Sequence, residues 1–449
     1  MTENKIVIVG LGVGGFSALL AAKKTSPDAN ITIIERRNYD MFSPCGLPFV
    51  IEGIIPDLEN LKHKVPTESM GVLKLLEHEL RSIDTDKKSV QVVDLTTGTE
   101  KGIEFDNLIL AIGSEPFIPP IPGARELLGH GVYTISYPED TGTIINAAKG
   151  KKHAAVMGAG PIGLEVAVAL KAVGMDVIVV EMLDWAFPKA LDKDMASAVS
   201  KTLKTLGIRS LMGKAVEKVI GEDHIQSVVV DGETLDVDLL VAASGVRANL
   251  SFVQDAGIEV GRFGITTDMG MMTSVKGVFA VGDCVEVTNP LSHRPWSSQL
   301  ANSGYRQGAV AGTNAAGGYA TYDGSFTTFV SVVGNLEVAA TGFNSYFAAL
   351  YGFDVVSGKA KGKTKPDWYP GGEDISVKVL VDSTTGKLLG AQAVGTGAAA
   401  RINVVAAALK GGLTVYDLAE VELAYCPAVS ETYDVLTKAC DFAVRKMNK

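Results

Sequence analysis

Short apolar runs alternate with segments of helical character along the first part of the chain. Lys5–Val9 is a run rich in Ile and Val, a pattern typical of a buried strand, and Phe16–Lys24 has the character of a helix. A second apolar run, Ile31–Ile34, follows the helical segment. Strands that alternate with helices in this way predict an α/β fold built on a parallel sheet.

A glycine-rich turn joins the first strand to its helix. Gly10, Gly12 and Gly15 complete the pattern G-x-G-x-x-G, and the second strand ends at Glu35. In this setting the glycines permit a tight turn, a close approach of the backbone to a pyrophosphate and close packing of the helix, while the acid accepts hydrogen bonds from a ribose. The glycine pattern alone is a weak signal, but the strand, helix and acid around it predict a dinucleotide site.

The same arrangement occurs a second time. The strand, the three glycines, the next strand and its acid are Ala154–Met157, Gly158, Gly160, Gly163, Val177–Val180 and Glu181. Two complete patterns predict two dinucleotides on one chain. No Arg or Lys stands directly after Glu181, which favours the free 2′-hydroxyl of NADH over the 2′-phosphate of NADPH.

The pattern changes from about Tyr322. Strand-like runs such as Phe326–Val333 and Val377–Val381 follow one another, and a helical stretch, Ala398–Leu409, comes after them. A chain of 449 residues is too long for one compact core, and at roughly 150 residues per domain about three domains are expected.

The overall charge and hydropathy exclude several classes of partner. With 41 basic and 51 acidic residues the formal net charge is −10, which argues against nucleic acid or an anionic membrane as a partner. The longest apolar stretch, Ile6–Ala22, is interrupted by four glycines and is not a membrane span. It also lacks the basic start and cleavage site of a secretory signal, so we expect a cytoplasmic protein.

Four cysteines, Cys45, Cys284, Cys426 and Cys440, lie far apart, and no Cys-x-x-Cys pair occurs. This spacing suggests neither a disulfide framework nor a zinc site, and we expect no metal. A lone cysteine is commonly a small buried side chain, so each must be interpreted from its surroundings.

Further segments carry a resemblance to a known family. Val278–Asp283 reads as a strand that ends in Gly-Asp and resembles the second FAD signature of flavoproteins with two dinucleotide domains. Gly-Asp alone would be an ordinary strand end followed by an Asp N-cap. Leu108–Gly113 and Leu239–Gly245 resemble the segments in which such chains cross between their two nucleotide domains.

Essentially the whole chain resembles the pyridine nucleotide-disulfide oxidoreductases. The resemblance implies two Rossmann-like domains, FAD-binding (1–113 and 246–321) and NAD(P)H-binding (114–245), and an α+β C-terminal dimerisation domain (322–449). It implies a homodimer with a shared active site. FAD would be held by Gly10, Gly12, Gly15, Glu35, Gly113, Gly282 and Asp283, and NADH or NADPH by Gly158, Gly160, Gly163 and Glu181.

The loop 39–49 contains Cys45 and follows Glu35 by about ten residues. In the family this loop enters a helix that lies against the flavin ring, so the resemblance implies that Cys45 lies at a helix N-terminus facing the flavin.

Dithiol reductases carry a second cysteine five positions later, where this chain has Val50. They also carry a C-terminal His-Pro pair, where this chain has Cys426-Pro427.

The remaining resemblance is to the single-cysteine branch: coenzyme A disulfide reductases, NADH oxidases and NADH peroxidases. The string Cys-Gly-Leu-Pro-Phe is its most specific match. In that branch the cysteine forms a mixed disulfide with a substrate thiol or cycles through sulfenic acid. Cys426 is either a resolving thiol or a small structural residue.

Other site residues follow from the same resemblance. Tyr369, in Trp-Tyr-Pro-Gly, and Tyr425 match tyrosines that approach the cysteine across the dimer and protonate a leaving thiolate; the alternative is interface packing. Glu165 is expected near the nicotinamide.

Ser17, Lys24 and Tyr305 are the expected substrate contacts, with coenzyme A as the substrate or ligand that the resemblance suggests. Ala21, Met41 and Pro44, however, replace polar residues of the coenzyme A enzymes.

Three functions are therefore in competition. The leading hypothesis is an enzyme that passes electrons from NAD(P)H through FAD to Cys45 and reduces a small disulfide or polysulfide, such as coenzyme A disulfide. The second is an NADH oxidase or peroxidase that reduces oxygen or hydrogen peroxide through a sulfenate on Cys45. The third is a reductase of a ferredoxin- or rubredoxin-like protein, in which Cys45 takes no part.

Overall fold

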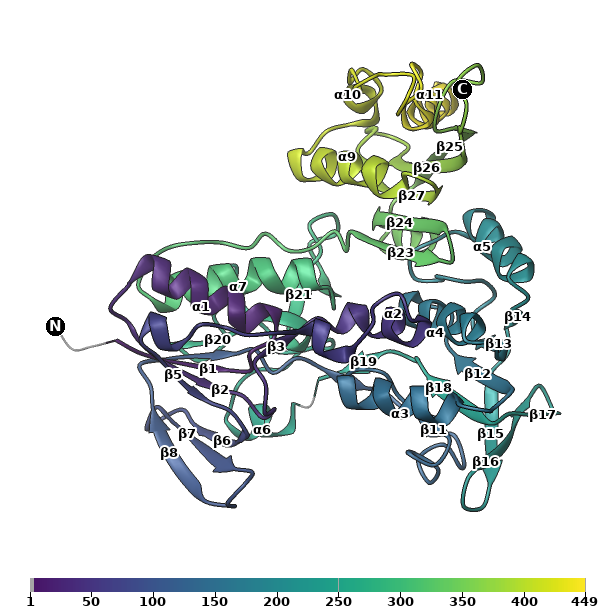
Figure 1. The fold of residues 1–449 in the computed structure, drawn as a ribbon. Helices are drawn as coiled ribbons and strands as arrows, with labels where there is room; N and C mark the ends of the chain where they lie inside the picture. The colour runs from purple at the N-terminus through teal and green to yellow at the C-terminus, as the bar shows by residue number, and fades with distance from the viewer. Residues whose placement is uncertain (1–3, 249, 449) are drawn as a thin grey trace. The chain divides into compact units, whose positions relative to one another are not determined.

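The computed structural model describes residues 4–248 and 250–448 (Figure 1). They fall into two compact units. The first holds 4–46, 57–115, 246–248 and 250–325, and the second holds 47–56, 116–245 and 326–448. No helix among the described residues is both long and apolar enough to cross a membrane.

The first unit is built on a five-stranded parallel sheet with the order β20-β9-β1-β2-β5. Its strands are β1 (Lys5–Val9), β2 (Asn30–Ile34), β5 (Val72–Leu75), β9 (Asn107–Leu110) and β20 (Val278–Ala280). Strand β1 lies in the middle and is buried from Ile6 to Val9, as expected for a run that is apolar on both faces.

Helices α1 (Val13–Thr25) and α7 (Ala301–Ala315) lie side by side against this sheet (Figure 1). Their backbones touch because α7 carries glycines at the contact. A Cβ atom on Gly308 would lie 2.1 Å from the carbonyl oxygen of Gly14, and one on Gly312 would lie 2.1 Å from that of Ala18. Side chains at these positions would push the two helices apart.

A three-stranded antiparallel sheet completes the core of this unit, with β6 (His78–Asp84), β7 (Ser89–Asp94) and β8 (Glu100–Glu104). The shorter elements are β3 (Met41–Phe42), β4 (Lys62–His63), β19 (Val246–Arg247), β21 (Glu286–Thr288), β22 (Pro295–Ser297), α6 (Ser251–Asp255) and the 3₁₀ turns η1 (Pro44–Gly46), η2 (Leu58–Leu61), η3 (Glu68–Met70) and η4 (Gly282–Cys284). Strand β10 (Glu115–Pro116) stands where the chain leaves the unit.

The second unit contains another five-stranded parallel sheet, with the order β11-β18-β12-β13-β14. Its strands are β11 (Val132–Tyr133), β12 (His153–Met157), β13 (Asp176–Glu181), β14 (Arg209–Met212) and β18 (Leu239–Ala242). Its helices are α3 (Pro138–Ala148), α4 (Pro161–Ala172) and α5 (Lys193–Thr205), and it carries the antiparallel strands β15 (Val216–Gly221), β16 (Ile225–Val230) and β17 (Glu233–Asp236). Helix α2 (Leu47–Glu52) packs on α4 and α3.

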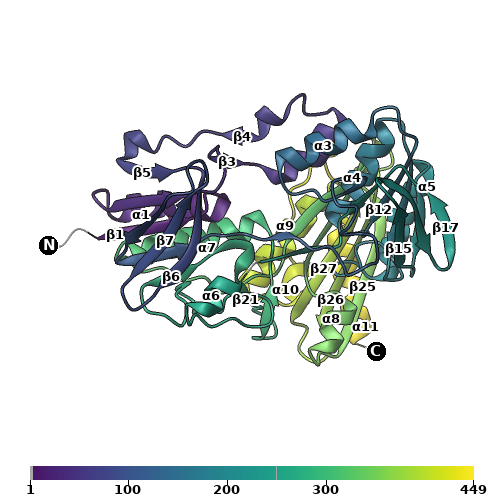
Figure 2. The same ribbon diagram turned by 90° about the horizontal axis from the view of Figure 1, so that it is seen from below.

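The C-terminal part of this unit is an antiparallel sheet with the order β23-β24-β27-β26-β25. Its strands are β23 (Phe329–Val333), β24 (Leu336–Gly342), β25 (Val355–Lys363), β26 (Asp374–Asp382) and β27 (Leu388–Gly395). Figure 2 shows β25, β26 and β27 side by side. Its helices are α8 (Ser345–Leu350), α9 (Ala398–Gly411), α10 (Val415–Ala419) and α11 (Val435–Met447).

These sheets confirm the predicted α/β class, with two Rossmann-like parallel sheets and an antiparallel C-terminal sheet. The division into three domains with boundaries near 113, 245 and 321 stays a prediction.

An ionic cluster joins the C-terminal sheet to the start of α5, and two of its members, Lys378 and Asp192, are buried. The Lys378 ammonium lies 2.8 Å from the Asp192 carboxylate and 3.0 Å from that of Asp194. Asp192 also accepts hydrogen bonds from the backbone N–H (2.9 Å) and the hydroxyl (2.7 Å) of Ser345. Burial alone would lower the pKa of Lys378, but the two aspartates outweigh it and raise that pKa.

We predict that Lys378→Met destabilises the protein by about 3 to 5 kcal/mol, because it leaves the buried Asp192 charge without its counter-ion. Lys363→Met is the matched control: Lys363 lies on the neighbouring strand and pairs with Asp374 at 2.7 Å on the surface. Because that pair is exposed to solvent, its loss should have little effect on stability. Urea unfolding followed by tryptophan fluorescence compares the two, and equal effects would contradict a structural role for the cluster.

Candidate functional site

The turn between β1 and α1 requires glycine at two positions for reasons internal to the protein. Gly10 has φ = 95°, and a Cβ atom there would lie 2.2 Å from the carbonyl oxygen of Ala111. A Cβ atom on Gly15 would lie 2.0 Å from the carbonyl oxygen of Gly10. Gly12 is different, because its Cβ atom would meet no protein atom within 4 Å. Space is therefore kept open at the helix N-terminus, where a phosphate would bind.

The turn between β12 and α4 repeats this geometry. Gly158 has φ = 110°, and its Cβ atom would lie 2.5 Å from the carbonyl oxygen of Ala243. The Cβ atom of Gly163 would lie 2.1 Å from the carbonyl oxygen of Gly158, whereas Gly160 again faces open space. The two turns therefore offer the same cradle for a pyrophosphate.

The two acids that follow these turns are bonded differently. Glu35 accepts hydrogen bonds from the Leu11 backbone N–H (2.8 Å), from the Arg37 backbone N–H (3.0 Å), and from the Arg37 guanidinium at 2.7 and 2.6 Å. Glu181 accepts from the backbone N–H groups of Ala159 (2.8 Å) and Leu183 (2.9 Å).

A carboxylate has about four lone-pair positions. At Glu35 all four are filled, so a ribose can bind there only if Arg37 releases a hydrogen bond. The Arg37 guanidinium lies over the rings of Tyr39 and Phe42, at 5.3 and 5.1 Å from their centroids. Glu181 keeps two positions for ribose hydroxyls among the contacts of the described residues.

The Gly282-Asp283 turn is held by two contacts. The Gly282 N–H donates to the side-chain oxygen of Gln307 on α7 (2.7 Å), and the Ser114 hydroxyl donates to Asp283 (3.1 Å). Burial raises the pKa of Asp283. The side-chain nitrogen of Gln307 is buried and has no hydrogen-bond partner among the described residues. A Cβ atom on Gly282 would meet no protein atom.

These features fit FAD in the first unit. The open cradle at Gly12 suits its pyrophosphate, and Gly113, with φ = 67°, and Gly282 both face open space at the carboxyl ends of β9 and β20. Asp283 adds an acceptor, and the unpartnered side-chain nitrogen of Gln307 adds a donor, at the same edge of the sheet. Ligands of open α/β sheets bind at this edge.

Cys45 is exposed and stands in the 3₁₀ turn η1, directly before α2. The turn is fixed at its base: the Ser43 N–H donates to the Leu61 carbonyl (2.8 Å), and the Gly46 N–H donates to the Ser43 carbonyl (3.1 Å). The Ser43 hydroxyl is hydrogen-bonded to Nε2 of His63 at 2.8 Å. The pairing of β3 with β4 brings His63 to this loop. Sequence reasoning missed His63, and no motif marks it.

The other cysteines differ from one another. Cys284 and Cys440 are buried, and burial raises the pKa of each thiol to about 12, so both stay protonated. Cys426 is exposed, and its backbone N–H donates to the Ser430 hydroxyl (3.1 Å) in a turn between α10 and α11. Its role as a resolving thiol stays a hypothesis.

The expected catalytic partners of Cys45 belong to the second unit. Glu165 lies on α4, and its carboxylate accepts a hydrogen bond from Ser331 on β23 (2.7 Å). Tyr369 lies between β25 and β26, with the Lys365 ammonium 5.5 Å from its ring centroid. Tyr425 precedes Cys426 and is 47% exposed. The approach of these residues to Cys45 stays a prediction.

The expected substrate contacts lie on α1 and α7. Ser17 is buried, and its hydroxyl donates to the Tyr305 carbonyl at 2.7 Å, so as placed it serves the contact between the two helices. Lys24 and the Tyr305 side chain are exposed. Their binding of a substrate stays a prediction.

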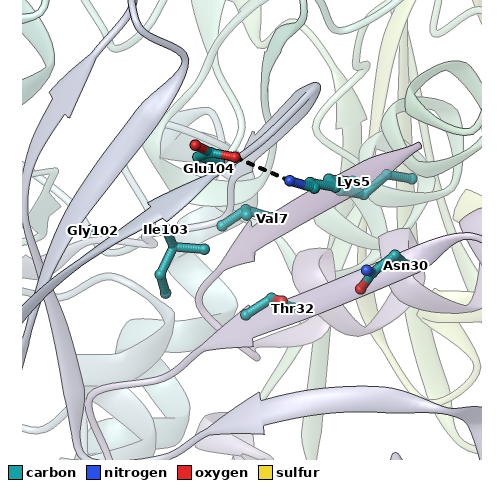
Figure 3. A pocket seen from close by; sticks show the side chains of 8 residues that line it. Lys5, Val7, Asn30, Thr32, Gly102, Ile103 and Glu104 are labelled. Atoms are coloured by element: carbon teal, nitrogen blue, oxygen red, sulfur yellow. Dashed lines mark hydrogen bonds and ion pairs between the residues drawn. The ribbon is translucent and has the colours of Figure 1, made fainter. Parts of the chain in front are cut away.

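A separate hollow lies at the opposite end of the first sheet (Figure 3). It lies where β1 and β2 begin, beside Ile103 of β8, and an ion pair of 3.0 Å between Lys5 and Glu104 spans it. Since nucleotides bind at the carboxyl ends of the strands, this hollow is not the dinucleotide site.

Comparison with known proteins agrees with this geometry. The model of the family described as "Pyridine nucleotide-disulphide oxidoreductase" matches residues 4–312, and the model of its dimerisation domain matches residues 328–436. The chain belongs to this family. The assignment accounts for both parallel sheets and for the antiparallel C-terminal sheet.

Individual family members are similar over nearly the full length. An NADH oxidase of Methanocaldococcus jannaschii is 36% identical over 99% of both chains. An NAD(P)H sulfur oxidoreductase (CoA-dependent) of Pyrococcus furiosus is 32% identical over 97% of this chain and 98% of that protein. The structure of an NAD-dependent persulfide reductase from A. fulgidus has a TM-score of 0.95 and 31% identity, covering 99% of this chain and 83% of that chain.

We predict that Gly12→Ala and Gly160→Ala fold normally but lose nucleotide affinity, since each added methyl group meets open space in the protein and occupies a cradle. Gly12→Ala should weaken FAD binding, and Gly160→Ala should weaken NADH binding while FAD is retained, each by at least about tenfold, or about 1.4 kcal/mol.

Equilibrium dialysis of FAD and NADH titration of the flavoprotein measure these affinities. Gly15→Ala is the control that destabilises the fold itself, because its methyl group meets the Gly10 carbonyl. Unchanged FAD affinity in Gly12→Ala would show that the first turn does not hold the cofactor.

Proposed function

We propose that this flavoprotein takes electrons from NADH and uses Cys45 to reduce a low-molecular-weight disulfide or polysulfide. The observation that carries the proposal is the exposed thiol of Cys45, on a turn fixed to the unit that carries the FAD features. Val50 stands where a second thiol would have to be, so the disulfide partner of Cys45 is the substrate's own sulfur.

The chemistry at Cys45 takes two steps. The Cys45 thiolate attacks one sulfur of the substrate, RS–SR′, which forms a Cys45–S–SR mixed disulfide and releases R′S⁻. An electron pair and a proton then cleave the mixed disulfide into RSH and the Cys45 thiolate. When bound, FAD would supply this electron pair, which would come from NADH as hydride.

The second unit would supply the other roles. Glu165 would contact the nicotinamide, and Tyr369 and Tyr425 from a second copy of the chain would protonate the leaving thiolate. Support for a homodimer with a shared site comes from the match of residues 328–436 to the dimerisation domain of the family.

Coenzyme A disulfide is one candidate substrate, because a similar protein is named CoA-dependent.

The preference for NADH rests on the residues after the second acid. Met182 and Leu183, which follow Glu181, are exposed and apolar, so neither side chain offers a cation to a 2′-phosphate. The two unfilled acceptor positions of Glu181 suit a free ribose diol.

An NADH oxidase or peroxidase is the second candidate function. It is favoured by the identity of 36% to a protein named NADH oxidase. In this cycle the Cys45 thiolate and hydrogen peroxide, with one proton, give Cys45 sulfenic acid and water. An electron pair and two protons then return the thiol and a second water.

We predict that Cys45→Ser lowers NADH-dependent reduction of coenzyme A disulfide and polysulfide by on the order of a thousandfold or more, because a serine hydroxyl cannot form a disulfide. Reduction of the bound flavin by NADH should be unchanged. Stopped-flow absorbance of the flavin and steady-state NADH consumption measure the two steps separately.

Cys426→Ser is the matched control, since it removes another exposed thiol. Turnover of disulfide or polysulfide at the wild-type rate in Cys45→Ser would refute the proposal. Turnover of wild type with oxygen or peroxide alone would favour the oxidase instead, and turnover by Cys45→Ser with a protein acceptor would favour the electron-transfer reductase.

A further inference from the structure

Strand β23 places a hydroxyl among apolar side chains. Ser331 is 3% exposed and lies between Phe329 and Val333 on the inward face of the strand, whereas Val330 on the other face is 51% exposed. A buried hydroxyl is unfavourable unless it is hydrogen-bonded. If only packing mattered, an alanine or valine would suit this position. The serine is therefore explained by the group to which its hydroxyl is hydrogen-bonded.

That partner is the carboxylate of Glu165. The Ser331 hydroxyl donates to Oε1 at 2.7 Å, and the backbone N–H of Val332 also bonds to the carboxylate. Helix α4 packs on β23 along this contact. Stacking of Phe329 on Phe187, with ring centroids 6.2 Å apart, holds the strand in place beside it.

Two opposing effects act on Glu165. Burial raises the pKa of its carboxyl, and the hydrogen bonds from Ser331 and Val332 oppose that rise. The charged residues of the elements packed on α4 are Glu52 of α2, His153 of β12, and Asp176 and Glu181 of β13, and none of them contributes to the shift. Burial therefore acts most strongly on the pKa of Glu165, and the hydrogen bonds that oppose it come from the C-terminal sheet.

We infer that Ser331 is a positioning residue for the reaction with NADH: its hydroxyl holds the Glu165 carboxylate in one orientation beside the nicotinamide nucleotide. Glu165 stands two residues after Gly163, in the helix whose first turn forms the second cradle. The C-terminal sheet thus takes part in the chemistry of the nucleotide domain. The inference rests on the proposed role of Glu165.

The first measurement needs no NADH and no turnover. Infrared difference spectra of the flavoprotein over a pH series follow the carboxyl C=O band of Glu165, which is assigned by its disappearance in Glu165→Gln. Without the hydrogen bond from Ser331, burial raises the pKa of Glu165 with less opposition. Ser331→Ala should therefore move the midpoint of this band upward by about one pH unit, and Ser331→Thr should restore it.

Thr341→Val is the matched control, because it removes another buried hydroxyl of the same sheet, bonded to Thr328 at 2.7 Å. It should leave the midpoint of Glu165 in place. Equal midpoints in wild type and Ser331→Ala would overturn the inference.

The second measurement is flavin reduction by NADH over the same pH range. Ser331→Ala should shift its pH profile in the direction of the infrared midpoint and slow the limiting rate severalfold, and Ser331→Thr should restore both. In a Glu165→Gln background, Ser331→Ala should have no further effect. An equal effect in that background would mean that Ser331 acts by some other route.

The two measurements separate the inference from the proposed function. If the infrared midpoint shifts but Glu165→Gln reduces flavin as fast as wild type, Glu165 has no part in the reaction with NADH, and the catalytic part of the inference falls. The fate of Cys45 does not enter either measurement, because disulfide turnover is not required.

Discussion

The close approach of a helix to the strand before it is the constraint on which both nucleotide sites depend. In the first sheet the carbonyl oxygen of Gly10, at the strand end, occupies the place that a Cβ atom on Gly15 of the helix would need. In the second sheet the carbonyl oxygen of Gly158 does the same at Gly163. This contact brings the helix N-terminus to the strand end, where its N–H groups can meet a pyrophosphate. The open space at Gly12 and Gly160 is what remains for the ligand.

The two sites share this backbone and differ in their acids. Arg37 neutralises Glu35 and is itself held over two aromatic rings, so the first site has a built-in counter-ion. Glu181 has no such partner among its hydrogen bonds, and its neighbours are apolar and exposed. A site of that kind suits a nucleotide that enters and leaves in each cycle. In the proposed function, electrons arrive at this exchangeable site and leave through the thiol of Cys45.

Sequence periodicity located the two Rossmann-like units because their strands are buried on both faces and read as unbroken apolar runs. The predicted strand Lys5–Val9 is confirmed, but α1 begins at Val13, three residues before the expected start. Gly14 and Gly15 lie inside that helix, and glycine has a low helix propensity. Packing against α7 overrides it.

The contacts that sequence could not predict are those made between distant segments. Leu47–Pro56 packs with α4 rather than with the strands that precede it in the chain. His63 reaches Ser43 only through the pairing of β3 with β4, and Ser331 reaches Glu165 across 166 positions. Single hydroxyl and imidazole groups carry no periodicity, so the sequence does not show which partner each will meet.

We propose that Cys45 is a second redox centre beside the flavin. The most direct test is an anaerobic NADH titration of enzyme that has first reacted with one equivalent of disulfide or peroxide. Full reduction should consume two NADH per FAD in wild type, one for the flavin and one for oxidised Cys45, and one NADH per FAD in Cys45→Ser. Consumption of a single NADH by both proteins would contradict it.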